Sequence, residues 1–369
     1  MIARPDRIRN MLVSHGLDSL IAFAHENVYY LSGYRTLDIN DFAAVIFPLD
    51  HEPILLVSKT DEYYVSEEWR KKARYFGRYY IEGVPNTSGD FQDAAEGIAS
   101  IFKQFCLKRV GLDDRALSID FYDCFRAKVP GCEFVRASDI FDELRMIKSE
   151  EEVRRITNAL RVTEKALSTT YEKVREGMTE LDVANELRIA LALEKADCSW
   201  VEMGGAAGVP TYPNPKHIIR NGEILHLDVG SIYEGYSCDT SRDAVIGKPN
   251  DRQRIVNETI SYALDQSIES ICPGIRASDV FRIGQETVRK SFPQYWRHQI
   301  GHGTGIIPHE PPRISPLNDR LLAAGMVLDI EIPYYAYGFG TFNVEDTVVV
   351  THLGHEVLSR LGRGLAVLG

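Results

Sequence analysis

Short runs of apolar residues separated by polar turns fill the first part of the chain, and they predict strands that alternate with helices. The expected strands are residues 18–23, 43–48, 53–58 and 109–112. The expected helices are residues 4–16 and 90–107. The second and third strands flank a turn at Asp50 and His51, which predicts a hairpin. This alternation predicts an α/β domain with a mixed sheet.

Longer helical patterns follow. Ser149 followed by Glu150 and Glu151 is typical of an N-cap with acidic residues in the first turn of a long helix. Thr179 and Asp182 resemble a capping box, and this second helix is expected to end near residue 195. Further helices are expected at residues 250–271 and 277–291. We therefore place a domain boundary near residues 142–149 and expect domains at 1–145 and 146–369.

Between these helices, the stretch from Asp228 to Asp239 predicts two strands joined by a turn, with turn residues at 230–231 and 234–235. If the strands pair antiparallel, Asp228 and Asp239 can lie across from each other on one face. Two adjacent carboxylates in an apolar sheet repel each other and are costly unless a cation lies between them. Aspartates near glycine are also common as turn or capping residues, so this stretch alone leaves both interpretations open.

Three downstream residues favour the interpretation that a cation lies between the carboxylates. His302 is flanked by glycines that let the main chain approach closely. Glu331 and Glu345 each lie in a strand-like apolar run, where an unpaired carboxylate is unfavourable. Two aspartates, two glutamates and one imidazole suit two divalent ions of Mn, Co, Fe or Zn, bridged by carboxylates.

The order of these motifs resembles the M24 metallopeptidase family. The motifs are Asp-x10-Asp, Gly-His-Gly-x-Gly-x3-His-Glu-Pro-Pro, Glu, and Val-Glu-Asp-Thr, over about residues 145–360. The family has the pita-bread fold and includes prolidase, aminopeptidase P and methionine aminopeptidase, with creatinase as a metal-free relative. The resemblance implies an α/β (α+β) chain: a creatinase/prolidase-like N-terminal domain, then a pita-bread catalytic domain with pseudo-two-fold halves.

The resemblance also implies roles for individual residues. The metal ligands would be Asp228, Asp239, His302, Glu331 and Glu345. Asp239 and Glu345 would bridge the two ions, and Glu331 would also take the proton of the hydroxide nucleophile held between them. His309, seven residues after His302, would bind the substrate carbonyl, although a plain loop histidine is the alternative.

Other residues near the motifs have two interpretations each. Arg313 could bind a substrate carboxylate or be a surface arginine. Arg242 is expected to hold the metal-binding carboxylates in place without binding the metal itself. Asp346 should point to the other face of its strand and be structural. His226 alternates with Asp228, so it faces the same side, where a supporting or packing role is expected.

The chain departs from the family near the substrate. Prolidases and aminopeptidases P carry a histidine at the position of Thr211 here (228 − 17). Tyr212 could donate the missing hydrogen bond instead, and His217 is expected to be displaced. Residues 199–208 are expected to form a strand and an active-site loop, and residues 26–34 resemble a loop of the N-terminal domain.

Composition narrows the class of protein. A net charge of −11 over 369 residues argues against nucleic acid as a partner. Six scattered cysteines without CxxC pairs predict reduced thiols and a cytoplasmic protein. We expect no signal peptide, and no apolar run approaches the ~18 residues that a membrane span needs.

Three functions are compatible with this sequence. The first is a dinuclear-metal Xaa-Pro peptidase of the prolidase or aminopeptidase P type, acting on short peptides as a homodimer. The second is a small-molecule amidohydrolase, similar to ectoine hydrolase or creatinase, or a lyase on the same fold. Thr211, at a position where prolidases and aminopeptidases P have a histidine, supports this second function. The third is a non-enzymatic binding module, against which all five ligand positions argue.

Overall fold

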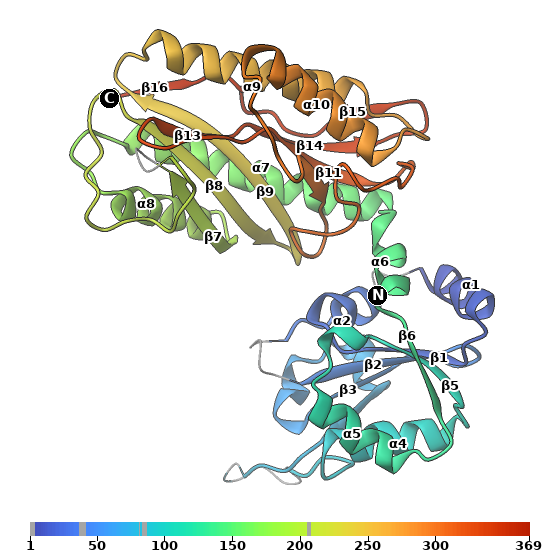
Figure 1. The fold of residues 1–369 in the computed structure, drawn as a ribbon. Coiled ribbons are helices and arrows are strands. Elements are labelled where there is room, and N and C mark those ends of the chain that lie inside the picture. Colours follow the sequence, from blue (N-terminus) through green and yellow to red (C-terminus); the bar gives the residue numbers. More distant parts are fainter. Residues whose placement is uncertain (1–3, 37–41, 81, 83–86, 205–207) are drawn as a thin grey trace. The chain divides into compact units, whose positions relative to one another are not determined.

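The computed structural model describes residues 4–36, 42–80, 82, 87–204 and 208–369. The chain divides into two compact units, Met1–Arg145 and Met146–Gly369. Each unit combines strands and helices, which confirms the expected α/β class (Figure 1). In the described part of the chain, no helix combines the length and apolar composition needed to cross a membrane. All six cysteines lie in the described ranges and are free.

The N-terminal unit is built on a six-stranded mixed sheet with the strand order β4-β3-β2-β1-β5-β6. The strands are β1 Ser19–Ala22, β2 Ala43–Pro48, β3 Ile54–Ser58, β4 Ala73–Phe76, β5 Arg109–Leu112 and β6 Glu133–Arg136. The expected hairpin is present, because β2 and β3 pair antiparallel. β1, β5 and β6 pair in parallel, as strands joined by helices do.

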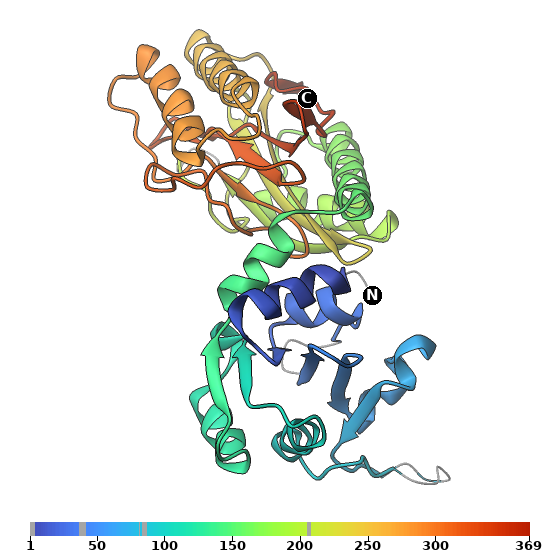
Figure 2. The same cartoon turned by 90° about the vertical axis from the view of Figure 1, so that its right-hand side faces the viewer.

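Helices cover both faces of this sheet. They are α1 Pro5–His15, α2 His25–Ser32, α3 Glu67–Arg70, α4 Ala94–Gln104, α5 Ile119–Lys128 and α6 Ser138–Met146, with 3₁₀ turns at Lys59–Tyr64 and Asp114–Ala116. α4 and α5 bury Ile98 and Phe125 against one face, in a core that includes Ile46 and Val110. Figure 2 shows α1 and α2 (blue) on the opposite side of the strands.

The segment at residues 26–34 corrects one expectation, because most of it is the helix α2 rather than a loop. The helix buries Val28, Tyr30 and Leu31, and it ends where Gly33 adopts a left-handed conformation with φ of 73°. Tyr30 donates its hydroxyl hydrogen to the carbonyl of Leu144 at 3.0 Å. The helix is thus fixed by contacts with a segment far away in sequence, which local patterns do not reveal.

The C-terminal unit contains two four-stranded sheets, with the orders β16-β9-β8-β7 and β10-β11-β14-β15, and a small β12-β13 ribbon. The strands are β7 Asp197–Gly204, β8 Ile224–Tyr233, β9 Tyr236–Ile246, β10 Gly301–Gly303, β11 Val327–Glu331, β12 Tyr334–Ala336, β13 Gly340–Phe342, β14 Glu345–Val350, β15 His355–Val357 and β16 Ala366–Leu368. The helices are α7 Glu150–Lys173, α8 Glu180–Leu193, α9 Asp251–Glu269 and α10 Ala277–Ser291.

The helices of this unit lie outside and the sheets lie inside. Leu167 of α7 and Leu187 of α8 pack against the β8–β9 sheet. Ile260 of α9 and Val280 of α10 pack in a core with the β11–β14 sheet. Figure 1 shows α9 and α10 (yellow to orange) on one side of the strands and α8 (green) on the other. The inner faces of the two sheets are therefore free to hold a site.

The hairpin of β8 and β9 corrects two details of the sequence interpretation. The turn lies at Glu234 and Gly235, whose φ values are 49° and 80°, and residues 230–231 continue β8. Asp228 pairs with Ser241, and Asp239 pairs with Gly230, so the two aspartates are diagonal neighbours on one face rather than opposite each other. Diagonal side chains can still share a cation.

Candidate metal centre

Five strands bring the predicted ligands to one place. Asp228 lies on β8, Asp239 on β9, His302 on β10, Glu331 on β11 and Glu345 on β14. Glu331 is directly opposite Glu345 across the β11–β14 pair. Because residues directly opposite each other on neighbouring strands point to the same face, this register sets both carboxylates on the same side of the sheet.

The cluster is tight enough for shared cations. Carboxylate oxygens of Asp228, Asp239 and Glu345 lie within 4.8 Å of one another. Nε2 of His302 lies 3.7 Å from Oδ2 of Asp239 and 4.0 Å from Oε1 of Glu345. Oδ1 of Asp239 and Oε2 of Glu345 are buried and have no hydrogen-bond partner among the described residues. These oxygens and the imidazole are a donor set that fits divalent metals such as Mn, Co, Fe or Zn.

Electrostatics also favours a cation at this place. Burial, followed by repulsion from neighbouring carboxylates, raises the pKa of Asp228, Asp239 and Glu345 well above that of an ordinary carboxyl group. Burial, and then the neighbouring His309, lowers the pKa of His302 to about 3. His302 is therefore neutral near pH 7, which is the form that binds a metal.

His309 lies at the open side of the cluster. Its side chain is 63% exposed, and its Nε2 is 3.2 Å from Oδ2 of Asp239. The rings of His302 and His309 lie 4.1 Å apart, centroid to centroid. Glu310, the next residue, is buried and pairs with Lys148 at 3.0 Å. A partly exposed imidazole on an anchored loop can donate a hydrogen bond to a molecule that enters the site.

A cavity of about 360 Å³ opens onto the cluster. Beside the predicted ligands and His309, it is lined by Trp200, Glu202, Arg297, His298, Gln299, Pro308 and Tyr335. Trp200 donates its Nε1 hydrogen to Oδ1 of Asp228 at 3.3 Å. Sequence reasoning missed these lining residues, although Trp200 lies in the segment expected to form a strand next to the site.

Two predicted substrate-binding residues do not line this cavity. Tyr212 is 84% exposed, and Arg313 is also exposed. Thr211 forms a main-chain pair with Met203 of β7, which fixes the segment beside that strand. Residues 199–204 belong to β7, as expected, whereas 205–207 of the expected active-site loop lie outside the described residues. His217 is held apart, with its Nε2 3.1 Å from Oε2 of Glu223.

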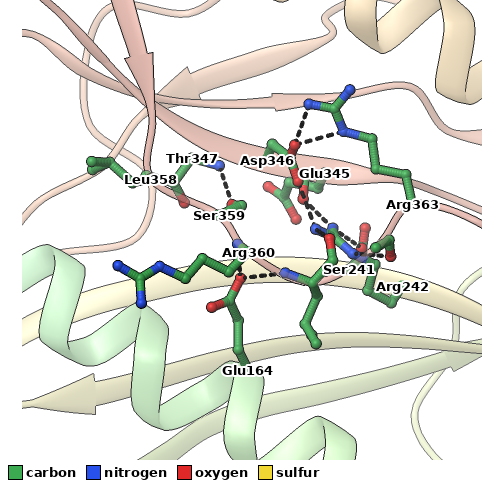
Figure 3. Close-up of polar contacts among 12 residues, drawn as sticks. Glu164, Ser241, Arg242, Glu345, Asp346, Thr347, Leu358, Ser359, Arg360 and Arg363 are labelled. Carbon is green, nitrogen blue, oxygen red and sulfur yellow. Dashed lines mark hydrogen bonds and ion pairs between the residues drawn. The ribbon is translucent and has the colours of Figure 1, made fainter.

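Arg242 lies on the opposite face of β9 from Asp239, so it does not touch the metal-binding carboxylates themselves. It donates to the main-chain carbonyl of Glu345 and pairs with Asp346 at 2.6 Å. Figure 3 shows Arg363 approaching the same aspartate from the other side. Arg242 thus contacts the main chain of the predicted ligand Glu345 rather than its carboxylate, and Asp346 forms ion pairs with Arg242 and Arg363.

His226 is fully buried on the same side as Asp228. Its Nδ1 lies 2.9 Å from Oδ1 of Asp243, and its Nε2 lies 4.0 Å from Oδ2 of Asp228. Burial alone would lower the pKa of His226, but the hydrogen bond with Asp243 and the nearby carboxylates raise it. The predicted ligand Glu331 also has a polar side chain beside it: Asn343 donates its Nδ2 hydrogen to Oε2 of Glu331 at 3.0 Å.

Comparison with known proteins agrees with this geometry. The model of metallopeptidase family M24 matches residues 154–352, and that of the creatinase/prolidase N-terminal domain matches residues 4–147. A Xaa-Pro dipeptidase of Pyrococcus horikoshii is 27% identical over 364 residues, covering 97% of each chain. The structure of a prolidase from Pyrococcus furiosus superimposes with a TM-score of 0.80 at 26% identity, covering 96% of this chain and 99% of that one. An X-Pro aminopeptidase structure from Thermotoga maritima shares the fold, with a TM-score of 0.84 at 22% identity and 99% coverage of both chains.

Proposed function

This chain belongs to metallopeptidase family M24 and is a metal-dependent hydrolase, and we propose that it cleaves the Xaa-Pro bond of short peptides. The observation that carries the proposal is the buried cluster of acidic side chains and one neutral imidazole at the base of a cavity of about 360 Å³. A cavity of this size admits a short peptide and excludes a folded protein chain. The related proteins that are named Xaa-Pro dipeptidase support the same substrate class.

Each residue of the cluster has a proposed role. Two divalent ions would be held by Asp228, Asp239, His302, Glu331 and Glu345. When bound, such ions lower the pKa of water and polarise a scissile carbonyl group. The donor set accepts Mn, Co, Fe or Zn, so metal availability would select among them.

Two groups of the chain would act on the substrate itself. Glu331 would accept the proton released by the attacking water, and the hydrogen bond from Asn343 at Oε2 fixes the direction of its carboxylate. His309 would donate a hydrogen bond to the oxygen of the scissile carbonyl, where negative charge develops. The indole of Trp200 and the ring of Tyr335 would bind apolar parts of the peptide and limit water in the cavity.

A second candidate is an amidohydrolase that acts on a small non-peptide amide, or a lyase on the same fold. The observation that favours it is at Thr211, where the family histidine is replaced and the main chain pairs with Met203. Tyr212 is exposed and does not line the cavity, which argues against it as the missing hydrogen-bond donor.

One assay separates the two candidates. Chelator-treated protein is reloaded with Mn, Co or Zn and given Xaa-Pro dipeptides, an Xaa-Pro-Xaa tripeptide and an N-acetylated diamine. Metal-dependent release of proline from the peptides is the expected result, and the preferred peptide distinguishes dipeptidase from aminopeptidase. Cleavage of the diamine without proline release would instead establish the second candidate.

We also propose a homodimer in the cytoplasm, as expected from the family resemblance and from the free thiols. Light scattering during size-exclusion chromatography tests the dimer, because a mass near 41.6 kDa would correspond to a single chain. Fractionation of cells that express the protein tests the compartment.

A further inference from the structure

A series of buried polar contacts, most of them hydrogen bonds, connects ligands from the two halves of the metal centre. It begins at Asp228, whose Oδ2 faces Nε2 of His226 at 4.0 Å. Nδ1 of His226 meets Oδ1 of Asp243 at 2.9 Å. Both oxygens of Asp243 accept the main-chain N–H of Asn343, at 3.1 and 3.0 Å. The series of contacts ends at Glu331, whose Oε2 accepts the side-chain amide hydrogen of Asn343 at 3.0 Å.

The residues of this series of contacts are more deeply buried than folding alone would favour. His226 and Asn343 are 0% exposed, and Asp243 is 2% exposed. Burying three polar side chains costs free energy that apolar residues in the same space would not cost. His226 Nε2 has no hydrogen-bond partner among the described residues, and it is directed toward a predicted metal ligand. The arrangement resembles the outer partners that orient the ligands of metal sites.

The backbone around Asn343 is fixed from the other face as well. Arg242 donates to the carbonyl of Glu345, and its partner Asp346 is held by Arg363 (Figure 3). The main chain at residues 343–346 therefore has contacts on both sides. The freedom that remains at the site is rotation of the carboxylates, and His226 and Asn343 face two of these carboxylates.

We propose that His226, Asp243 and Asn343 are positioning residues that hold Asp228 and Glu331 in a fixed relation before a cation binds. The proposal rests on the ligand roles given above for those two carboxylates. The contact between the Asp243 carboxylate and the main-chain N–H of Asn343 joins the β8–β9 hairpin to the half that carries β11 and β14, so that the orientations of the two ligands depend on each other.

The test uses His226→Leu and Asn343→Ala in the full chain, with Mn²⁺ binding measured by calorimetry on chelator-treated protein. Binding is expected to weaken about 10- to 100-fold in each variant, as is typical when an outer partner of a metal ligand is removed. In metal-saturated protein, kcat for proline release is expected to fall while KM changes little, because the substrate contacts remain. His226→Gln, which supplies a side-chain amide N–H that can face Asp228, is expected to recover part of the affinity.

Asn257→Ala is the matched control. Asn257 is also a buried asparagine with main-chain partners, since it accepts the N–H of Leu365 at 3.0 Å, but it lies on α9. This variant should lower the melting temperature and leave Mn²⁺ affinity unchanged. Folded His226→Leu and Asn343→Ala proteins that bind Mn²⁺ as tightly as the parent would overturn the proposal. Absence of proline release from the parent would contradict the proposed function only, because the affinity measurement needs no peptide.

Discussion

A single missing side chain decides how the rim of the metal centre is built. Gly230 lies within β8, and a Cβ atom added there would meet the Trp200 ring at 2.0 Å. The indole therefore packs directly on the glycine. From that position it donates a hydrogen bond to Asp228. A residue that looked like part of a turn in the sequence thus determines where the tryptophan lies.

Gly230→Ala is expected to displace the indole and to weaken Mn²⁺ binding, because Asp228 loses its Trp200 partner. Overpacking of this kind costs about 1–3 kcal/mol of unfolding free energy. Urea unfolding and Mn²⁺ calorimetry measure the two effects. Gly354→Ala is the control, since a Cβ there meets nothing within 4 Å. Equal stability and affinity in both variants would refute this account of Gly230.

Glu331→Gln keeps the size of the side chain and removes the base. We expect kcat for proline release to fall by at least about 10²-fold, the usual contribution of a positioned general base. The amide oxygen of the new residue can still accept the hydrogen bond from Asn343, so the protein should remain folded. Glu356→Gln, at an exposed position of β15, should retain full activity. Near-parental kcat in metal-loaded Glu331→Gln would remove Glu331 from the mechanism.

At the scale of elements, one buried ion pair ties the start of α7 to the loop that carries His309. Lys148 and Glu310 are 3.0 Å apart, and both side chains are 1% exposed. Glu310 also accepts the main-chain N–H of Ile306 at 3.2 Å, which closes the loop after β10. This loop is therefore held by a charge pair in addition to the main-chain hydrogen bonds between Gly303 and Glu310.

Lys148→Met is expected to lower the free energy of unfolding by about 3–5 kcal/mol, because it leaves the Glu310 carboxylate buried and unpaired. Replacing both partners, as in Lys148→Met with Glu310→Leu, should recover part of the loss, since no uncompensated charge remains. Denaturant unfolding of the two proteins compares these values. A double variant that is less stable than Lys148→Met would contradict this explanation.

At the scale of the whole molecule, the metal centre makes stability depend on pH. The pKa values of Asp228, Asp239 and Glu345 are raised, chiefly by burial, and burial raises that of Asp329 to about 7. The folded, metal-free chain thus retains protons that the unfolded chain has lost above about pH 4. The contribution of these groups to the free energy of unfolding of the metal-free chain therefore falls as pH rises through their folded-state pKa values.

Metal binding must displace the protons held by the ligands Asp228, Asp239 and Glu345, so we expect Mn²⁺ affinity to increase between pH 6 and pH 8. Each displaced proton contributes about a tenfold increase per pH unit while it is still bound to the free protein. His302 contributes nothing in this range, because its pKa is lowered to about 3. Calorimetry at several pH values measures the slope, and melting curves should show a larger gain from Mn²⁺ at pH 8 than at pH 6. An Mn²⁺ affinity that does not change between pH 6 and pH 8 would contradict this prediction.

The sequence by itself determined the features that depend on neighbours along the chain. The N-cap at Ser149 and the capping box at Thr179 start α7 and α8 as expected, and α10 has the expected bounds of residues 277–291. These signals are local, because a cap or a helical period involves residues a few positions apart. The motif order also identified the M24 family, since the spacing of its ligands is itself a linear pattern.

The tertiary structure alone decided which other residues surround those ligands. Asp243 and Asn343 are 100 positions apart, and nothing in either local pattern indicates their contact. Arg297 and Tyr335 enter the cavity wall, whereas Tyr212 and Arg313 stay out of it, because the loops that carry them are positioned by long-range packing. The diagonal register of Asp228 and Asp239 has the same origin, since the turn at residues 234–235 sets the pairing of both strands. Local patterns specify which side chains can bind a metal, and the folded sheet specifies how they are oriented and what accompanies them.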